Sequence, residues 1–292
     1  MSAPGLLHKY NNRLVAFEFA TSSGTPHANV LLFVGGLGDG LLTVPYVSPL
    51  AAKLDTIGWG CSQLLISSSY RGWGTGSLAR DASEIDDAVT YFSGLRHGKV
   101  VLMGHSTGSQ DTIYYLTRHA PSSSAARISG GIMQAPVSDR EAMQVLMPEL
   151  YADLLAEAIT YTTTGKGDEV LPQKFAKKFL DTPISASRWV SLATKLGDDD
   201  FFSSDIEQEH LKSTFGVIDV PVLVLYSGSD EYVPLSVDKT ALVSRWKAAT
   251  KPGIWSDVSQ VVKGATHNLG KGSEETSMED ALDAILAFVS SL

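Results

Sequence analysis

A chain of 292 residues with 43% hydrophobic and 19% charged residues has the composition of a globular protein with a substantial buried core. Its formal net charge of −9 argues against nucleic acid or an anionic membrane as the main partner. Cys61 is the only cysteine, which excludes an internal disulfide. No signal peptide or membrane span is visible, and we therefore expect a cytoplasmic protein.

Strand-like and helix-like segments alternate along the chain. Buried strands are expected at 29–34, 61–66, 99–103, 128–133, 220–226 and 258–262. Helices are expected at 41–54, at 77–95, directly after Ser106 and at 281–288. Alternation of this kind predicts an α/β protein with a mostly parallel central sheet and helices on both of its faces.

The segment between Val137 and Phe215 breaks this alternation, because its pattern is helical and polar with no convincing strand. We interpret residues 137–215 as a helical cap inserted into a core made of residues 1–136 and 216–292. Ligands of such sheets bind at the carboxyl ends of the strands. The cap is therefore expected to lie over that edge.

The pentapeptide Gly104-His105-Ser106-Thr107-Gly108 has the pattern G-x-S-x-G and lies between a predicted strand and a predicted helix. A serine on such a tight turn holds its hydroxyl out of the sheet, and side chains in place of the two glycines would collide with the strand and the helix. The pattern alone occurs often by chance. Its setting predicts that Ser106 is a nucleophile.

A serine nucleophile needs a base, and the base needs an orienting carboxylate. Asp230 follows the predicted strand 220–226, and His267 follows the predicted strand 258–262, so the order serine, acid, histidine is that of an α/β-hydrolase. Each residue alone has a plainer interpretation as a turn former or a surface residue. Together they predict a catalytic triad, with Glu231 as a weaker candidate for the acid.

An oxyanion hole requires two backbone N–H donors. Thr107 directly after the nucleophile supplies one, and the glycine-rich loop 35–40 is expected to supply the other, with Leu37 preferred over Gly36. Such a loop can also cradle phosphate, but here it lacks the glycine and lysine spacing of the phosphate-binding motifs. No metal or organic cofactor is expected.

The loop 67–76 is expected to reach the same edge. Tyr70, Arg71 and Trp73 are candidates for lining a substrate pocket, although aromatic residues in such loops more often pack beneath them. The acidic stretch 198–209 is interpreted first as a solvated helix start, with attraction of a cationic substrate as the alternative.

These residues resemble the α/β-hydrolase superfamily over nearly the whole chain outside 137–215. The strings GGLGDGLLTVPY, SSYRGWGTGSL and GHSTGSQD are similar to the fungal siderophore esterases of the fusarinine C esterase (SidJ-like) branch. The resemblance implies a cytosolic serine esterase that cuts ester bonds in hydroxamate siderophores, so that iron is released. It also assigns the triad to Ser106, Asp230 and His267 and the oxyanion donors to Leu37 and Thr107.

The sequence therefore predicts hydrolysis of a small-molecule ester through an acyl-enzyme on Ser106. A thioesterase, lipase or peptidase would use the same groups, because pocket shape and not fold decides among them. A ligand receptor with slow turnover on a hydrolase scaffold is a further alternative. The oligomeric state is left open.

Overall fold

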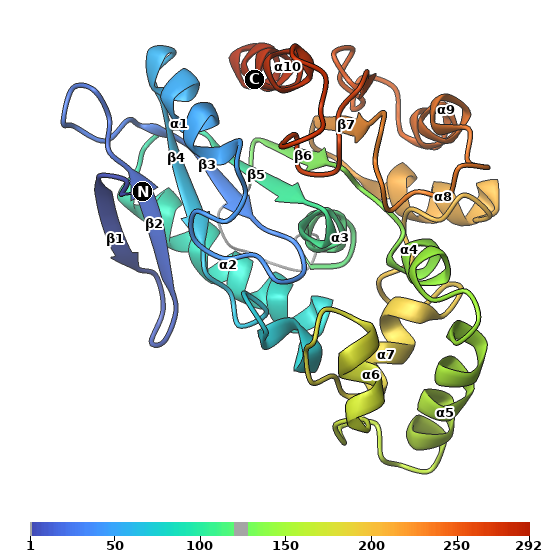
Figure 1. Ribbon diagram of the computed structural model, residues 1–292. Helices are drawn as coiled ribbons and strands as arrows, with labels where there is room; N and C mark the ends of the chain where they lie inside the picture. Colours follow the sequence, from blue (N-terminus) through green and yellow to red (C-terminus); the bar gives the residue numbers. More distant parts are fainter. Residues whose placement is uncertain (1, 120–127) are drawn as a thin grey trace.

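The computed structural model describes residues 2–119 and 128–292. Within them, one eight-stranded sheet has the strand order β1-β2-β4-β3-β5-β6-β7-β8 (Figure 1). The strands are β1 (Gly5–Lys9), β2 (Val15–Phe19), β3 (Asn29–Val34), β4 (Trp59–Leu64), β5 (Val100–His105), β6 (Gly130–Gln134), β7 (Val222–Ser227) and β8 (Gln260–Val262). The six strands from β3 to β8 pair in parallel, which confirms the predicted sheet.

The first two strands were not predicted. β1 and β2 form an antiparallel hairpin, and β2 joins the edge of the sheet by pairing antiparallel with β4. β1 carries mostly exposed side chains, so its sequence lacks the apolar run that identified the other strands. The hairpin extends the sheet at the end away from β8, at the left of Figure 1.

Ten α-helices lie in the described part of the chain. They are α1 (Val47–Thr56), α2 (Leu78–Leu95), α3 (Thr107–Tyr114), α4 (Asp139–Leu146), α5 (Tyr151–Thr163), α6 (Gln173–Lys178), α7 (Ala186–Ala193), α8 (Gln208–Thr214), α9 (Lys239–Ala249) and α10 (Ser277–Ser291). The predicted helix at 41–54 begins only at Val47, because Leu42 has a left-handed backbone and the residues before Tyr46 form turns.

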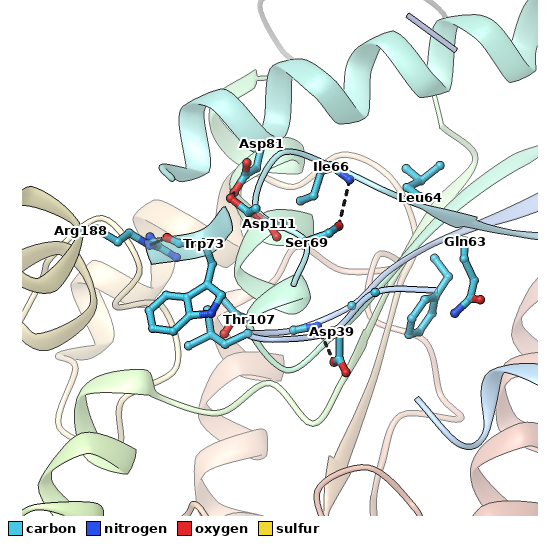
Figure 2. Close-up of a pocket in the computed structure, with 16 residues that line it drawn as sticks. Asp39, Gln63, Leu64, Ile66, Ser69, Trp73, Asp81, Thr107, Asp111 and Arg188 are labelled. Atoms are coloured by element: carbon cyan, nitrogen blue, oxygen red, sulfur yellow. Dashed lines mark hydrogen bonds between the residues drawn. The ribbon is translucent and has the colours of Figure 1, made fainter. Parts of the chain in front are cut away.

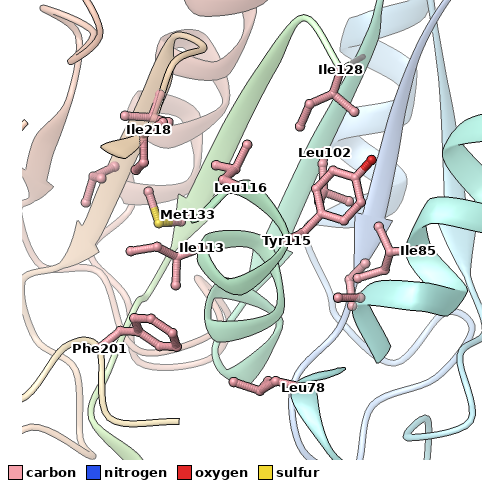
Figure 3. Close-up of a cluster of buried hydrophobic side chains, with 14 of the residues drawn as sticks. Leu78, Ile85, Leu102, Ile113, Tyr115, Leu116, Ile128, Met133, Phe201 and Ile218 are labelled. Carbon is pink, nitrogen blue, oxygen red and sulfur yellow. The ribbon is translucent and has the colours of Figure 1, made fainter. Parts of the chain in front are cut away.

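Alternating side chains of the parallel strands build a core on each face of the sheet. On β3, Val30 and Leu32 pack into the core shared with α2, α3 and α9, while Leu31 and Phe33 pack into the core shared with α1 and α10. Figure 3 shows part of the first core, where Ile113 of α3 lies among side chains of neighbouring elements. α3 is thus held against the sheet directly after Ser106.

Helices α4 to α8 follow β6 and precede β7, in the segment predicted to be helical. Side chains from α4, α5, α6 and α7 form a third apolar cluster of their own. Trp73, from the short 3-10 turn Gly72–Thr75 of the sheet region, also belongs to this cluster and contacts the ring of Phe179 edge to face. The inserted segment therefore packs on the loop that follows β4.

Candidate active site

Ser106 occupies a sharp turn between β5 and α3. Its backbone has φ 55° and ψ −126°, a combination that is strained for a residue with a side chain. A Cβ on Gly104 would lie 1.9 Å from the carbonyl oxygen of Gly108, and one on Gly108 would lie 2.4 Å from that of Val34. Gly104 is therefore required for β5 and α3 to meet this closely, and Gly108 for α3 to approach the end of β3.

The structure brings Ser106, His267 and Asp230 together at the carboxyl ends of three parallel strands. His267 Nε2 lies 2.8 Å from Ser106 Oγ, and His267 Nδ1 lies 2.7 Å from Asp230 Oδ2. Asp230 follows β7 and is almost fully buried, and His267 follows β8. The arrangement lets the imidazole accept the serine proton at Nε2 while Nδ1–H donates to the carboxylate.

The backbone and rings around His267 fix its position further. The N–H of His267 donates to Glu231 Oε2 at 2.9 Å, so Glu231 holds the histidine loop and does not contact the imidazole nitrogens. The Tyr232 ring meets the His267 ring edge to face, and the Tyr232 N–H donates to Asp230 Oδ1 at 3.0 Å. Asp230 is thus oriented by a backbone donor while it accepts from the imidazole.

Gln134, at the end of β6, is a buried residue that sequence reasoning missed. Its Nε2 donates to the carbonyl oxygen of His267 at 3.3 Å, and its Oε1 accepts from Tyr46 Oη and bonds to His105 Nδ1. Burial lowers the pKa of His105 to about 3, so that ring stays neutral beside His267. The signal that would have found Gln134 is a polar side chain closing an otherwise apolar strand.

The loop Gly35–Gly40 approaches the nucleophile closely. A Cβ on Gly36 would lie 2.6 Å from Ser106 Cβ. The N–H of Gly36 donates to Asp39 Oδ2 at 2.9 Å, so this donor is already engaged. Among the described residues, no acceptor is found for the N–H of Leu37 or of Thr107, the first residue of α3. Of the two candidates for the one donor expected from this loop, Leu37 therefore fits an oxyanion hole better than Gly36.

A cavity of about 190 Å³ opens beside Ser106. Its walls combine two histidine rings, the loop Gly35–Gly40 and apolar side chains of the inserted segment, with Leu37, Ser106, His267, Ala142, Leu146, Phe179 and Leu180 among them. The inserted segment thus contributes one wall of the space that the nucleophile faces.

Tyr70, Arg71 and Trp73, the candidate pocket residues, do not line this cavity, and Trp73 lines a neighbouring one. The Tyr70 ring lies against Gly40, and its hydroxyl accepts from the N–H of Leu41. Arg71 is exposed and pairs with Asp181 at 3.2 Å, while Trp73 is buried under its loop. Two of the three therefore brace neighbouring loops, and the third forms a surface ion pair.

The acidic stretch 198–209 is largely neutralised within the protein. Asp199 pairs with Arg188, Asp200 lies 3.4 Å from Arg140, and Asp205 pairs with both Arg140 and Lys195. The paired carboxylates act as internal contacts of the inserted segment. Attraction of a cationic substrate finds no support in this arrangement.

Asp139, at the start of α4, is a second cavity residue that the sequence analysis did not select. Its Oδ2 accepts from Gln110 Nε2 at 2.7 Å, and its Oδ1 accepts from the Thr107 hydroxyl at 3.3 Å. Burial raises the pKa of this carboxyl to about 7. A titrating group therefore stands beside the predicted oxyanion donor Thr107.

Among the described residues, no helix combines the length and apolar character needed to cross a bilayer. Their histidine, cysteine, aspartate and glutamate side chains form no group of three or more that could hold a metal ion.

Comparison with known proteins identifies the family of this chain and several relatives. A family described as "Protein of unknown function (DUF1749)" matches residues 1–290. A UPF0613 protein of Schizosaccharomyces pombe is 41% identical, with 98% of this chain and 96% of that protein covered. Fusarinine C esterase sidJ of Aspergillus fumigatus is 36% identical over 99% of this chain and 96% of that protein.

The solved structure of the siderophore hydrolase EstB from Aspergillus fumigatus superposes with a TM-score of 0.87 at 35% identity, covering 99% of this chain and 98% of EstB. The match extends over the sheet and the inserted segment alike, since almost none of either chain lies outside it. The chain belongs to the DUF1749 family and is an α/β-hydrolase of the carboxylic ester hydrolase class.

Proposed function

We propose that this protein is a serine esterase that hydrolyses carboxylic ester bonds through an acyl-enzyme. The observation that carries the proposal is the continuous hydrogen-bonded chain from Asp230 through His267 to Ser106. The backbone N–H groups of Leu37, which lines the cavity beside Ser106, and of Thr107, the next residue after Ser106, have no acceptor among the described residues. Geometry of this kind is what nucleophilic catalysis by serine requires.

In the first half of the reaction Ser106 Oγ attacks the ester carbonyl while His267 Nε2 takes its proton. The N–H groups of Leu37 and Thr107 stabilise the tetrahedral oxyanion. His267 then returns the proton to the leaving alcohol, and the acyl group stays on Ser106. In the second half a water attacks the acyl-enzyme with His267 again as the base, and Asp230 holds the imidazole in the required tautomer throughout.

The proposed substrate is a hydroxamate siderophore of the fusarinine C type, whose cleavage in the cytoplasm would allow iron release. This rests on the names of two relatives, a fusarinine C esterase and a siderophore hydrolase, each matched over nearly its whole length. The free Cys61 thiol fits a reducing compartment. A cavity of about 190 Å³ accommodates one arm of such a ligand and not the whole molecule.

We further propose that residues 137–215 act as a cap that shapes this cavity. Ala142, Leu146, Phe179 and Leu180 come from this segment and line the space beside Ser106. Specificity for the acyl or alcohol part of the ester would then depend on these side chains, while the chemistry belongs to the core.

A mass-spectrometric screen of ester hydrolysis tests the substrate. Ferric and iron-free fusarinine-type siderophores, their N-acetylated forms, p-nitrophenyl esters, acyl thioesters and monoacylglycerols are each incubated with the wild type and with Ser106→Ala. We expect Ser106-dependent cleavage with the highest kcat/KM on a siderophore. A higher kcat/KM on a thioester or monoacylglycerol would replace the substrate and keep the mechanism, whereas cleavage that survives Ser106→Ala would overturn both.

A further inference from the structure

Arg188, on α7 of the inserted segment, is a buried cation that the proposed reaction does not use. Its Nη1 lies 2.8 and 2.7 Å from the two carboxylate oxygens of Asp199, and its Nε donates to the carbonyl oxygen of Trp73 at 3.2 Å. These bonds give two of the guanidinium nitrogens acceptors and connect α7 to the loop that follows β4. A buried charge held this way has a fixed position.

The guanidinium lines a second cavity, which shares Leu37 and Asp39 with the cavity beside Ser106. Figure 2 shows Arg188 entering from one side, with Asp81 and Asp111 across from it and Thr107 nearby. Leu37 and Thr107, the residues of both proposed oxyanion donors, therefore line this space. Arg188 supplies the one positive charge among the described residues that line it.

The acids that line this cavity with Arg188 are Asp39 of the loop Gly35–Gly40, Asp81 on α2 and Asp111 on α3. Asp81 on α2 bonds to Ser68 and lies 3.5 Å from Arg80, with Glu84 one turn further along. Asp111 lies on α3, one turn after Thr107, and its Oδ1 is buried with no hydrogen-bond partner among the described residues.

Burial raises the pKa of Asp81 to about 6 and that of Asp111 well above its usual range, and the charge of Arg188 opposes both shifts. Asp139 at the start of α4 has a pKa raised to about 7 by burial, and Arg188 and His267 both act to lower it. An ionised carboxylate close to Leu37 and Thr107 makes the oxyanion of the tetrahedral intermediate less favourable. A neighbouring cation has the opposite effect.

We propose that Arg188 is a positioning residue of the esterase, whose charge offsets the buried carboxylates behind the oxyanion donors and favours the tetrahedral intermediate. The inference rests on the proposed function of Ser106, Leu37 and Thr107. It gives the inserted segment a part in the chemistry as well as in shaping the cavity.

The test compares a variant that removes the positive charge of Arg188 with one that removes the negative charge of its partner Asp199. Arg188→Met should lower kcat on a p-nitrophenyl ester about tenfold with little change in KM, as expected for one unit charge removed at a distance in a partly polar interior. Asp199→Asn leaves the cation in place without its partner, so kcat should stay equal to the wild type or rise. A purely structural clamp between Arg188 and Asp199 would instead lower kcat in both variants.

Arg188→Lys keeps the test decisive if Arg188→Met does not fold, because the methionine variant leaves Asp199 buried and unpaired. The lysine keeps the charge but loses the planar fork, so kcat should stay within about threefold of the wild type even where the melting temperature falls. A kcat in Arg188→Lys or Asp199→Asn that falls about tenfold overturns the inference.

The pH profile gives an independent readout. The charge of Arg188 holds down the pKa of Asp139 and of Asp81, so both carboxyls should ionise at a higher pH in Arg188→Met than in the wild type, and the ratio of wild-type to variant kcat should pass through a minimum between the two ionisations. A ratio that is constant with pH contradicts an electrostatic role. Fluorophosphonate labelling of Ser106 in the wild type distinguishes failure of the proposed function from failure of this inference. An unreactive Ser106 refutes the proposed function. A reactive Ser106, together with an unchanged kcat in Arg188→Met, refutes the role of Arg188 alone.

Discussion

The loop Gly35–Gly40 contributes residues to two cavities whose linings differ in chemistry. The cavity beside Ser106 combines two histidine rings and apolar side chains with the carboxyls of Asp39 and Asp139, and it gives a reacting carbonyl access to the nucleophile. The second cavity contains Asp81, Asp111 and Arg188 and, among its described lining, no residue of the triad. The difference teaches that Ser106 and His267 line the first cavity, whereas Arg188, the charge proposed to favour the tetrahedral intermediate, lines the second.

The largest effect should come from the nucleophile. Ser106→Ala should lower kcat on a p-nitrophenyl ester about 10⁵- to 10⁶-fold, because a triad without its nucleophile retains only the background rate that binding and the oxyanion hole provide. Steady-state kinetics measures it. Ser69→Ala, in the second cavity, is the matched control and should stay within about tenfold of the wild type. An equal loss of kcat in Ser106→Ala and Ser69→Ala would contradict the assignment of the reaction to the cavity beside Ser106.

The next effect separates two adjacent carboxylates. Asp230→Asn should lower kcat about 10⁴-fold, because the amide stabilises the wrong imidazole tautomer. Glu231→Gln should cost less than about tenfold, since Glu231 accepts from the His267 backbone N–H and does not touch the ring nitrogens. Comparison of kcat in the two variants decides which acid serves the triad, and a larger loss in Glu231→Gln would assign it to Glu231.

A smaller effect concerns the shared loop itself. Gly36→Ala places a methyl group 2.6 Å from Ser106 Cβ, so the oxyanion donors must shift and kcat should fall about 10²-fold. Gly38→Ala is the control, because Gly38 has φ +85° and open space around it. That variant should lose about 1 kcal/mol in unfolding free energy and little kcat. The reverse pattern would show that Gly36 does not set the approach of the loop to Ser106.

The smallest effect is expected at Arg71. Its pair with Asp181 is exposed on both sides, so Arg71→Ala should change the free energy of unfolding by less than about 0.5 kcal/mol and kcat/KM by less than about twofold. Chemical denaturation and kinetics measure both quantities. A tenfold rise in KM would instead return Arg71 to the substrate pocket for which the sequence made it a candidate.

Much of the fold could be predicted because its strands carry local signals. The apolar runs and the glycines around Ser106 encode β5, the turn and α3 within a few residues, and Asp230 and His267 follow strands whose parallel pairing brings their ends to one edge. β1 escaped prediction because an exposed edge strand needs no apolar run. The triad geometry follows from strand topology and residue spacing, and both can be predicted from the amino-acid sequence.

The pocket residues could not be predicted in the same way. Whether Trp73 faces a substrate or packs on Phe179 depends on how the inserted segment lies over the loop, which no local pattern specifies. Gln134, Asp139 and Arg188 likewise acquire their partners only through tertiary packing. Contacts of that kind decide which ester fits, and they are the part of the site that sequence alone leaves open.

Detection of the acyl-enzyme tests the central claim most directly. The wild type is mixed with a slowly deacylating ester, quenched in acid and analysed as intact protein and as peptides by mass spectrometry. The account predicts one acyl group per chain on the peptide that contains Ser106, absent in Ser106→Ala. Turnover with no adduct at early times, or an adduct on another residue, would contradict it.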